Sequence, residues 1–337
     1  MINYILIIPV IFSFLISLFI IPFWIKKSRE IRLVWPDMNE RFSEKVAGSG
    51  GIAPLLGFTI GILIFVAYRT FILKSNEFLV EIFAMLSVIL FLGGVGLVDD
   101  LLGWRKGGLR KKHRIILVAF SAIPLMVINA GKSEVLIPFF GSIELGLIYP
   151  LVAIPIGIIG AATTFNHLAG FNGLEAGNGI LVLLGVGLVA FFTGSSWLMV
   201  IALCMIGALF AFLFYNFYPA KVFPGDTMTL SVGGLIAIIT ILGNFEKVGV
   251  FFFLPFIIET LLKLKGGLKK HSFGKPKIDG TLDLRYKNIY SLSHLAILFL
   301  KKCNIKTTQK NVVYLLWTFQ ITIIILGFII FRKGIFL

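Results

Sequence analysis

The sequence predicts an all-α integral membrane protein with about ten transmembrane helices and both termini extracytoplasmic. Of its 337 residues, 58% are hydrophobic and only 14% are charged, whereas about 25% of a typical soluble domain is charged. Apolar runs of about 17–22 residues recur along the chain, and this length crosses a bilayer. Lys and Arg also gather in alternate loops. Together these observations exclude a soluble enzyme with one unusually apolar core, because a single core cannot bury so many separate runs.

The first predicted span, 3–25, has no basic residue before its apolar run, and Lys26, Lys27, Arg29 and Arg32 follow it. This order favours a retained helix with its N-terminus outside over a cleaved signal peptide. The apolar runs that follow predict nine further spans, at 51–72, 79–98, 114–130, 147–165, 178–193, 197–215, 228–243, 249–264 and 312–331. The absence of a repeat or a low-complexity linker indicates one polytopic domain over 1–337.

The distribution of positive charge sets the expected topology. Loops 26–50, 99–114, 216–227 and 265–311 carry 24 of the 31 Lys and Arg. Because basic residues stay on the cytoplasmic side, these loops are predicted to be cytoplasmic, together with the polar segment 166–177. The net charge of +15 is therefore interpreted as a topology signal, and no nucleic-acid partner is expected. Cys204 and Cys303 offer neither a disulfide framework nor metal-ligand spacing.

Polar clusters interrupt the apolar pattern at the predicted cytoplasmic face. Asp99 and Asp100 end one span, and Glu175 and Asp226 lie in "TTFNHLAGFNGLEAGNG" (163–179) and "YNFYPAKVFPGDT" (215–227). Carboxylates at membrane depth are costly and usually functional. Carboxylates and amides below a basic belt suit Mg²⁺ and a phosphorylated substrate. The pattern predicts an active site on the cytoplasmic face.

Each feature also has an ordinary structural explanation. The acid pair could mark the water interface, Asp226 could cap a helix, and the basic residues of 105–114 could contact lipid headgroups. Likewise, His167 and His294 could be ordinary interfacial histidines, and Phe223 could serve packing alone. Their joint occurrence on one face is what favours a functional site.

Three stretches, "GLVDDLLGWR" (96–105), "TFNHLAGFNGLEAG" (164–177) and "NFYPAKVFPGDT" (216–227), resemble the polyprenyl-phosphate N-acetylhexosamine-1-phosphate transferase superfamily, and in particular its dolichyl-phosphate N-acetylglucosaminephosphotransferase branch. The resemblance spans essentially the whole chain. It implies transfer of GlcNAc-1-phosphate from UDP-GlcNAc to dolichyl or polyprenyl phosphate, with UMP as the second product. This is the first step of lipid-linked oligosaccharide assembly for N-glycosylation. Mg²⁺ or Mn²⁺ as cofactor, membrane lipids as partners and a homodimer are further implications.

The resemblance also assigns roles to individual residues. It implies catalytic roles for Asp226 and for the pair Asp99 and Asp100, and metal binding by Asp226 and Asn166. Asn172 matches the amide that reads the uracil edge, and Phe223 matches the ring that stacks on it. The remaining expected substrate-binding residues are Glu44, Lys112, Arg114, Glu175, His271 and Lys275. Either Arg114 or Lys112 is expected to hold phosphate. In the first loop, Asp37, Asn39 and Glu44 would close over the nucleotide, although a solvated charged loop is an equally good account.

The last cytoplasmic loop departs from the family pattern. "LKKHSFGKPKIDGTLDLRYKN" (268–288) has neither the His-rich motif of bacterial relatives nor the Arg-His-Arg cluster of eukaryotic ones. A transferase of cell-envelope glycan synthesis that uses another UDP-N-acetylhexosamine is therefore an alternative. A transporter of an anionic lipid or metabolite is a second alternative, but it would place polar residues at the bilayer midplane. The expected location is the plasma membrane for a prokaryotic or archaeal source and the endoplasmic reticulum for a eukaryotic one.

Overall fold

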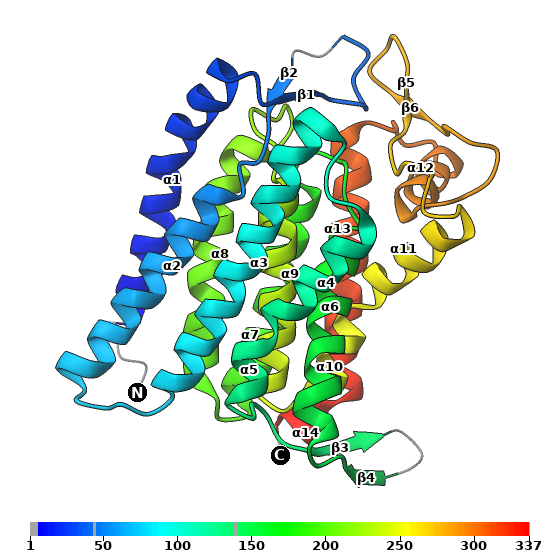
Figure 1. Ribbon diagram of the computed structural model, residues 1–337. Coiled ribbons are helices and arrows are strands. Elements are labelled where there is room, and N and C mark those ends of the chain that lie inside the picture. Colours follow the sequence, from blue (N-terminus) through cyan, green and yellow to red (C-terminus); the bar gives the residue numbers. More distant parts are fainter. Residues whose placement is uncertain (1–5, 43–44, 138–140, 337) are drawn as a thin grey trace.

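The computed structural model describes residues 6–42, 45–137 and 141–336, which form a bundle of helices with three small hairpins (Figure 1). The helices are α1 (Ile7–Glu30), α2 (Ile52–Ala67), α3 (Leu79–Lys106), α4 (Lys111–Ser121), α5 (Ile123–Val127), α6 (Ile154–Phe165), α7 (Leu174–Phe192), α8 (Ser196–Asn216), α9 (Gly225–Leu242), α10 (Glu246–Phe252), α11 (Leu254–Lys265), α12 (Leu292–Lys302), α13 (Gln309–Ile330) and α14 (Arg332–Ile335). A π-helical turn continues α2 over Tyr68–Ile72, and another leads into α6 over Tyr149–Ala153.

The hairpins lie at the two ends of the bundle. Each joins two antiparallel strands, namely β1 (Val34–Pro36) with β2 (Lys45–Ala47), β3 (Glu134–Ile137) with β4 (Gly141–Glu144), and β5 (Lys275–Pro276) with β6 (Leu282–Asp283). The β1–β2 and β5–β6 hairpins share one end, whereas α1 begins and α13 ends at the other end, where β3 and β4 also lie (Figure 1). This placement agrees with termini on one side of a membrane, and the side itself stays a prediction.

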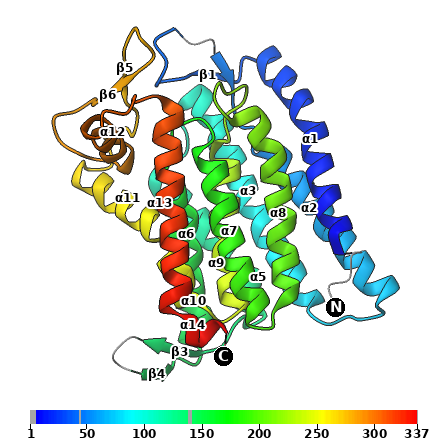
Figure 2. The same ribbon diagram turned by 180° about the vertical axis from the view of Figure 1, so that it is seen from behind.

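The described residues include seven helices that are long and apolar enough to cross a membrane, and Tyr149–Phe165 forms a shorter apolar helix. The all-α membrane class is therefore confirmed, while ten spans remain a prediction. In α9, 83% of the spanning window is buried, against 22% in α1 and in α13. Thus α9 lies at the centre of the bundle, and α1 and α13 flank it at opposite edges (Figure 2).

Two predicted spans are broken helices. The predicted span 114–130 is divided between α4 and α5, and 249–264 between α10 and α11. A proline stands in the first turn of each second helix, Pro124 in α5 and Pro255 in α11. Proline has no N–H to donate and is favoured where a helix starts. Each of these two predicted spans is therefore made of two helices, and α11 leaves the bundle sideways (Figure 1).

The helices that carry the acidic residues extend further than predicted. α7 begins at Leu174 and α9 at Gly225, so Glu175 and Asp226 lie in first turns. The partial positive charge of a helix N-terminus stabilises a carboxylate there. α3 continues to Lys106 and includes Asp99 and Asp100. The predicted loops 99–114, 166–177 and 216–227 are therefore partly helical.

A close approach of α3 to α9 brings these acids together. A Cβ atom at Gly96 would lie only 2.5 Å from the backbone of Asp226, so only glycine permits this contact. The two backbones meet one turn before Asp99 and Asp100, which places the acid pair beside the first turn of α9.

Candidate active site

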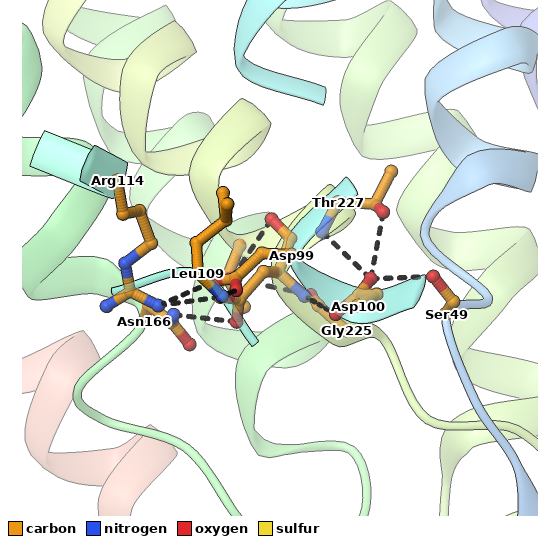
Figure 3. A network of polar contacts seen from close by, with 10 residues as sticks. Ser49, Asp99, Asp100, Leu109, Arg114, Asn166, Gly225 and Thr227 are labelled. Carbon is orange, nitrogen blue, oxygen red and sulfur yellow. Dashed lines mark hydrogen bonds and ion pairs between the residues drawn. The ribbon is translucent and has the colours of Figure 1, made fainter. Parts of the chain in front are cut away.

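Asp100 supports the first turn of α9. Its Oδ1 atom accepts a hydrogen bond from the backbone N–H of Asp226 at 2.8 Å. Its Oδ2 atom accepts hydrogen bonds from Ser49 Oγ at 2.6 Å, Thr227 Oγ1 at 2.9 Å and the Thr227 backbone N–H at 3.3 Å (Figure 3). These donors occupy both oxygens, and two of them are N–H groups that have no partner inside the helix. The geometry indicates a positioning role for Asp100.

Asp99 and Asp226 share the guanidinium of Arg114. The Nη1 atom of Arg114 lies 2.7 Å from Asp226 Oδ2 and 3.1 Å from Asp99 Oδ2 (Figure 3). The other oxygen of Asp99 accepts the Leu109 backbone N–H at 2.5 Å, which ties the segment between α3 and α4 to α3. The remaining oxygen of Asp226 accepts Asn166 Nδ2 at 2.8 Å. Asp226 is thus the point where α3, α4, α9 and the segment after α6 meet.

The backbone around Phe223 is held by the segment between α1 and α2. Phe223 N donates to Ala47 O at 2.7 Å, and Gly50 N donates to Phe223 O at 2.9 Å. Ala47 also forms an isolated parallel bridge with Val222. Next to this segment lies a cavity of about 530 Å³, whose lining includes Asp37, Asn166, Asn172, Phe223, Asp226 and His271. One cavity therefore unites most of the predicted nucleotide- and metal-binding residues.

A second, basic cavity of about 460 Å³ shares Gly170, His271 and Phe273 with the first. Lys111, Arg114, Lys263, Lys269 and Lys270 contribute to its lining. His167 also lines it and lies 2.9 Å from Thr260 through Nδ1. Burial lowers the pKa of His167 to about 4, and the charges of Lys263, Arg114 and Lys111 act in the same direction. The ring is therefore neutral near pH 7, and the cavity is suited to an anionic group.

An apolar groove of about 370 Å³ lies between α6, α9 and the α10–α11 pair. Its lining runs from Tyr149, in the π-helical turn before α6, to Thr164 in α6, two positions before Asn166, and includes Gly157, Ile236 and Ile257. Its lining is mainly apolar, which suits a hydrocarbon chain.

The structure distinguishes among the other predicted substrate-binding residues. Arg114 contacts the carboxylates, whereas Lys112 is exposed and lines neither the first cavity nor the basic one. Lys275 is exposed on β5 and also lies outside both cavities. Glu175 is buried, and its Oε1 atom accepts the Gly170 N–H at 3.1 Å. Glu44 lies outside the described residues.

Several residues that complete the site were not predicted from the sequence. Ser49 and Thr227 hold Asp100, and Lys111 and Lys263 line the basic cavity. The lysines belong to a general excess of basic residues at this face, and the two hydroxyl residues carry no distinctive spacing. Only the helical offset of three residues between Lys111 and Arg114 could have indicated that these two share a face.

Comparisons with known proteins agree with the resemblance seen in the sequence. The family model described as glycosyl transferase family 4 matches residues 82–244. A Saccharolobus solfataricus protein, provisionally named a UDP-N-acetylglucosamine--dolichyl-phosphate N-acetylglucosaminephosphotransferase, is 33% identical over 93% of this chain and 92% of its own length. A Dictyostelium discoideum protein, named a UDP-N-acetylglucosamine--dolichyl-phosphate N-acetylglucosaminephosphotransferase, is 27% identical over 74% of this chain and 70% of its own length. A phospho-N-acetylmuramoyl-pentapeptide-transferase of Halalkalibacterium halodurans is 31% identical over 77% and 82%.

Proposed function

Because the chain belongs to glycosyl transferase family 4, we propose that it transfers GlcNAc-1-phosphate from UDP-GlcNAc to dolichyl or polyprenyl phosphate. The products are a lipid-diphosphate-GlcNAc and UMP, and the reaction begins a lipid-linked oligosaccharide. One observation carries the proposal. Asp226 contacts Arg114 and Asn166 at a place where three spaces lie close together. These are the cavity lined by Phe223 and Asn172, the basic cavity and the apolar groove beside α6.

The three spaces correspond to the parts of the two substrates. Phe223 and Asn172 are placed to bind a base, since stacking and amide hydrogen bonds suit base recognition. The cations of the basic cavity, chiefly Lys111, Arg114 and Lys263, neutralise phosphate charge. The groove beside α6 holds the start of the polyprenyl chain.

The residues around Asp226 fit a bound Mg²⁺ whose remaining ligands come from the substrate. Among the described residues, no three His, Cys, Asp or Glu side chains are grouped to hold a metal by themselves. Asp226 and Asn166 offer one carboxylate and one amide oxygen, and Mg²⁺ is typically held by one or two carboxylates together with substrate phosphates. When bound, Mg²⁺ would neutralise the diphosphate and stabilise charge that develops during transfer. Asn166 now turns its amide nitrogen to Asp226, so its side chain must rotate to present its oxygen.

The proposed reaction is a single displacement. An oxygen of the lipid phosphate attacks the β-phosphorus of UDP-GlcNAc, and the bond from that phosphorus to the bridging oxygen breaks to release UMP. A phosphate monoester is mostly ionised near pH 7, so little general-base catalysis is needed. Arg114 leaves Asp226 to contact phosphate, and Asp99 keeps Arg114 close. Phosphoryl transfer depends mainly on such positioning and charge stabilisation.

The sugar and the location are the finer parts of this proposal. GlcNAc is favoured over MurNAc-pentapeptide because the Saccharolobus and Dictyostelium relatives are named for GlcNAc transfer. The same archaeal relative, together with one from Sulfolobus acidocaldarius, supports a location in the plasma membrane.

The proposal is tested with the purified chain in detergent with Mg²⁺ and dolichyl phosphate. UDP-GlcNAc, UDP-GalNAc and UDP-MurNAc-pentapeptide are compared as donors by release of UMP. UDP-GlcNAc is expected to give the highest kcat/KM, chelation of Mg²⁺ to stop transfer, and Asp226→Ala to abolish transfer in a variant that still folds. Asp279→Asn, in the exposed β5–β6 turn, is the control. Full activity of Asp226→Ala would remove the metal assignment, and no UMP from any donor would refute the proposed reaction.

A further inference from the structure

Asp37 is a buried carboxylate in the segment between β1 and β2, and it gathers donors from three parts of the chain. Its Oδ1 atom accepts the Asn39 backbone N–H at 2.9 Å. Its Oδ2 atom accepts Asn172 Nδ2 at 2.9 Å and Gln309 Nε2 at 3.0 Å. Asp37 is 6% exposed and Asn172 is 4% exposed. The segment after β1, the segment before α7 and the start of α13 therefore meet at this carboxylate.

This contact determines which way the amide of Asn172 faces. A carboxylate offers only acceptors, whereas a carboxamide offers an acceptor on one side and a donor on the other. Asn172 must therefore turn its NH₂ group toward Asp37, and its Oδ1 atom faces the other way. Among the described residues, no hydrogen bond to Asn172 Oδ1 is found, and Asn172, Asp37 and Phe223 line the same cavity. The free acceptor of Asn172 is thus available to a base stacked on Phe223.

We propose that Asp37 is a positioning residue that sets the nucleobase specificity of the site by holding the amide of Asn172 with its oxygen toward the base. The inference rests on the proposed function for the place of the nucleotide. Uracil carries an N–H at ring position 3, which donates to Asn172 Oδ1. Cytosine has an unprotonated nitrogen there, so two acceptors would face each other. A site that is built to hydrogen-bond a donor rejects an analogue lacking that donor, because its buried polar atoms remain unpaired.

The inference predicts the effect of exchanging donors and acceptors at the two positions. Asp37→Asn can present a donor or an acceptor, so the amide of Asn172 is free to rotate and accept cytosine. The double substitution Asp37→Asn/Asn172→Asp exchanges the two groups: the amide at 37 donates and the carboxylate at 172 offers acceptors in both directions. The preference for uracil is expected to fall in the single variant and to return in the double variant. Gln309→Leu removes another donor to Asp37 without touching Asn172, and is the matched control for a weakened network.

The test measures binding of UDP and CDP to the full chain by isothermal titration calorimetry in detergent with Mg²⁺. UMP release from UDP-GlcNAc is measured in parallel. The ratio Kd(CDP)/Kd(UDP) is expected to be at least about five in the wild type and in Gln309→Leu, since an unmatched buried polar group costs roughly a factor of 5 to 150. Asp37→Asn should lower the ratio at least about fivefold, and the double variant should restore it.

An equal weakening of UDP and CDP binding in Asp37→Asn, with an unchanged ratio, would show a merely structural role and overturn the inference. A wild type without preference would do the same. If Asp37→Asn proves too unstable to purify, Asp37→Ser is measured in its place: a lowered ratio supports the inference, and an unchanged ratio overturns it. Because binding needs no transfer, a wild type that prefers UDP but releases no UMP would refute only the proposed reaction.

Discussion

The contacts of Asp100 predict that Asp100→Asn disturbs the site through the first turn of α9. The carboxylate uses Oδ1 for the Asp226 N–H and Oδ2 for Ser49 and both donors of Thr227. Asparagine keeps one oxygen and presents NH₂ at the other place. In either orientation, one backbone N–H of α9 therefore loses its acceptor and faces a donor.

The cost follows from these contacts. A lost hydrogen bond to a charged group is worth about 1.5–3 kcal/mol. Removing a negative charge from a helix N-terminus adds about 0.3–1 kcal/mol. The free energy of unfolding should thus fall by roughly 2–4 kcal/mol, which lowers the apparent melting midpoint by on the order of 5 °C or more. Transfer should fall by about 10²-fold, since a displacement near 1 Å at a reacting centre has that effect.

The assay combines thermal unfolding in detergent with UMP release below the melting midpoint, and Ser49→Ala is measured alongside. Ser49→Ala removes one hydroxyl donor and leaves both backbone N–H groups paired, so it should lower stability less than Asp100→Asn. If Asp100→Asn melts like the wild type but transfers nothing, Asp100 acts directly on substrate and the positioning argument is wrong. Unchanged stability together with unchanged transfer would refute the contacts themselves.

Three further predictions test other parts of the structure. Phe223→Leu should raise the KM for UDP-GlcNAc about 5- to 150-fold with little change in kcat, because base–aromatic stacking is worth about 1–3 kcal/mol. An unchanged KM in steady-state assays would exclude stacking of the base on this ring. Gly225→Ala should lower both the melting midpoint and the rate of transfer, since φ is +70° and the added Cβ would lie 2.3 Å from Asp100 Oδ2. Gly94→Ala is the control, because its Cβ meets nothing within 4 Å. Equal behaviour of the two variants would contradict the close approach of Asp100 to the start of α9. Burial, assisted by the charges of Arg285 and Lys263, lowers the pKa of His294 in the folded chain. As the pH falls below the unfolded value of 6.5, the unfolded chain binds the proton first, so the free energy of unfolding decreases by up to about 1.4 kcal/mol per pH unit, whereas above pH 6.5 this contribution is constant. His294→Asn should reduce the slope of the free energy of unfolding against pH below 6.5, and identical slopes would show that His294 is not buried as a neutral ring.

The membrane class could be predicted from the sequence because apolar runs and basic loops report directly on burial in lipid. The gathering of Asp226, Asn166 and Arg114 was expected from the family resemblance, and the structure brings these side chains together. The role of Asp100 was not predictable in the same way. Its partners Ser49 and Thr227 are 51 and 127 positions away, and no local pattern marks a hydroxyl that will meet a distant carboxylate.

The predicted helix boundaries differ from the observed ones for another reason. Polar residues such as Glu175 and Asp226 look like loop residues, yet a helix N-terminus accommodates a carboxylate, so α7 and α9 begin before the apolar runs do. Pro124 and Pro255 did signal the breaks in two predicted spans. Hydropathy alone overrode that signal, because both sides of each break are apolar.

In the proposed reaction, one site moves a sugar together with its phosphate from a nucleotide to a lipid. The most direct measurement uses UDP-GlcNAc labelled with ³²P at the β-phosphate and follows the label after reaction with dolichyl phosphate. We expect the label to enter the lipid fraction in a one-to-one ratio with unlabelled UMP, and Asp226→Ala to prevent this. Label recovered as UDP, with sugar alone on the lipid, would contradict it.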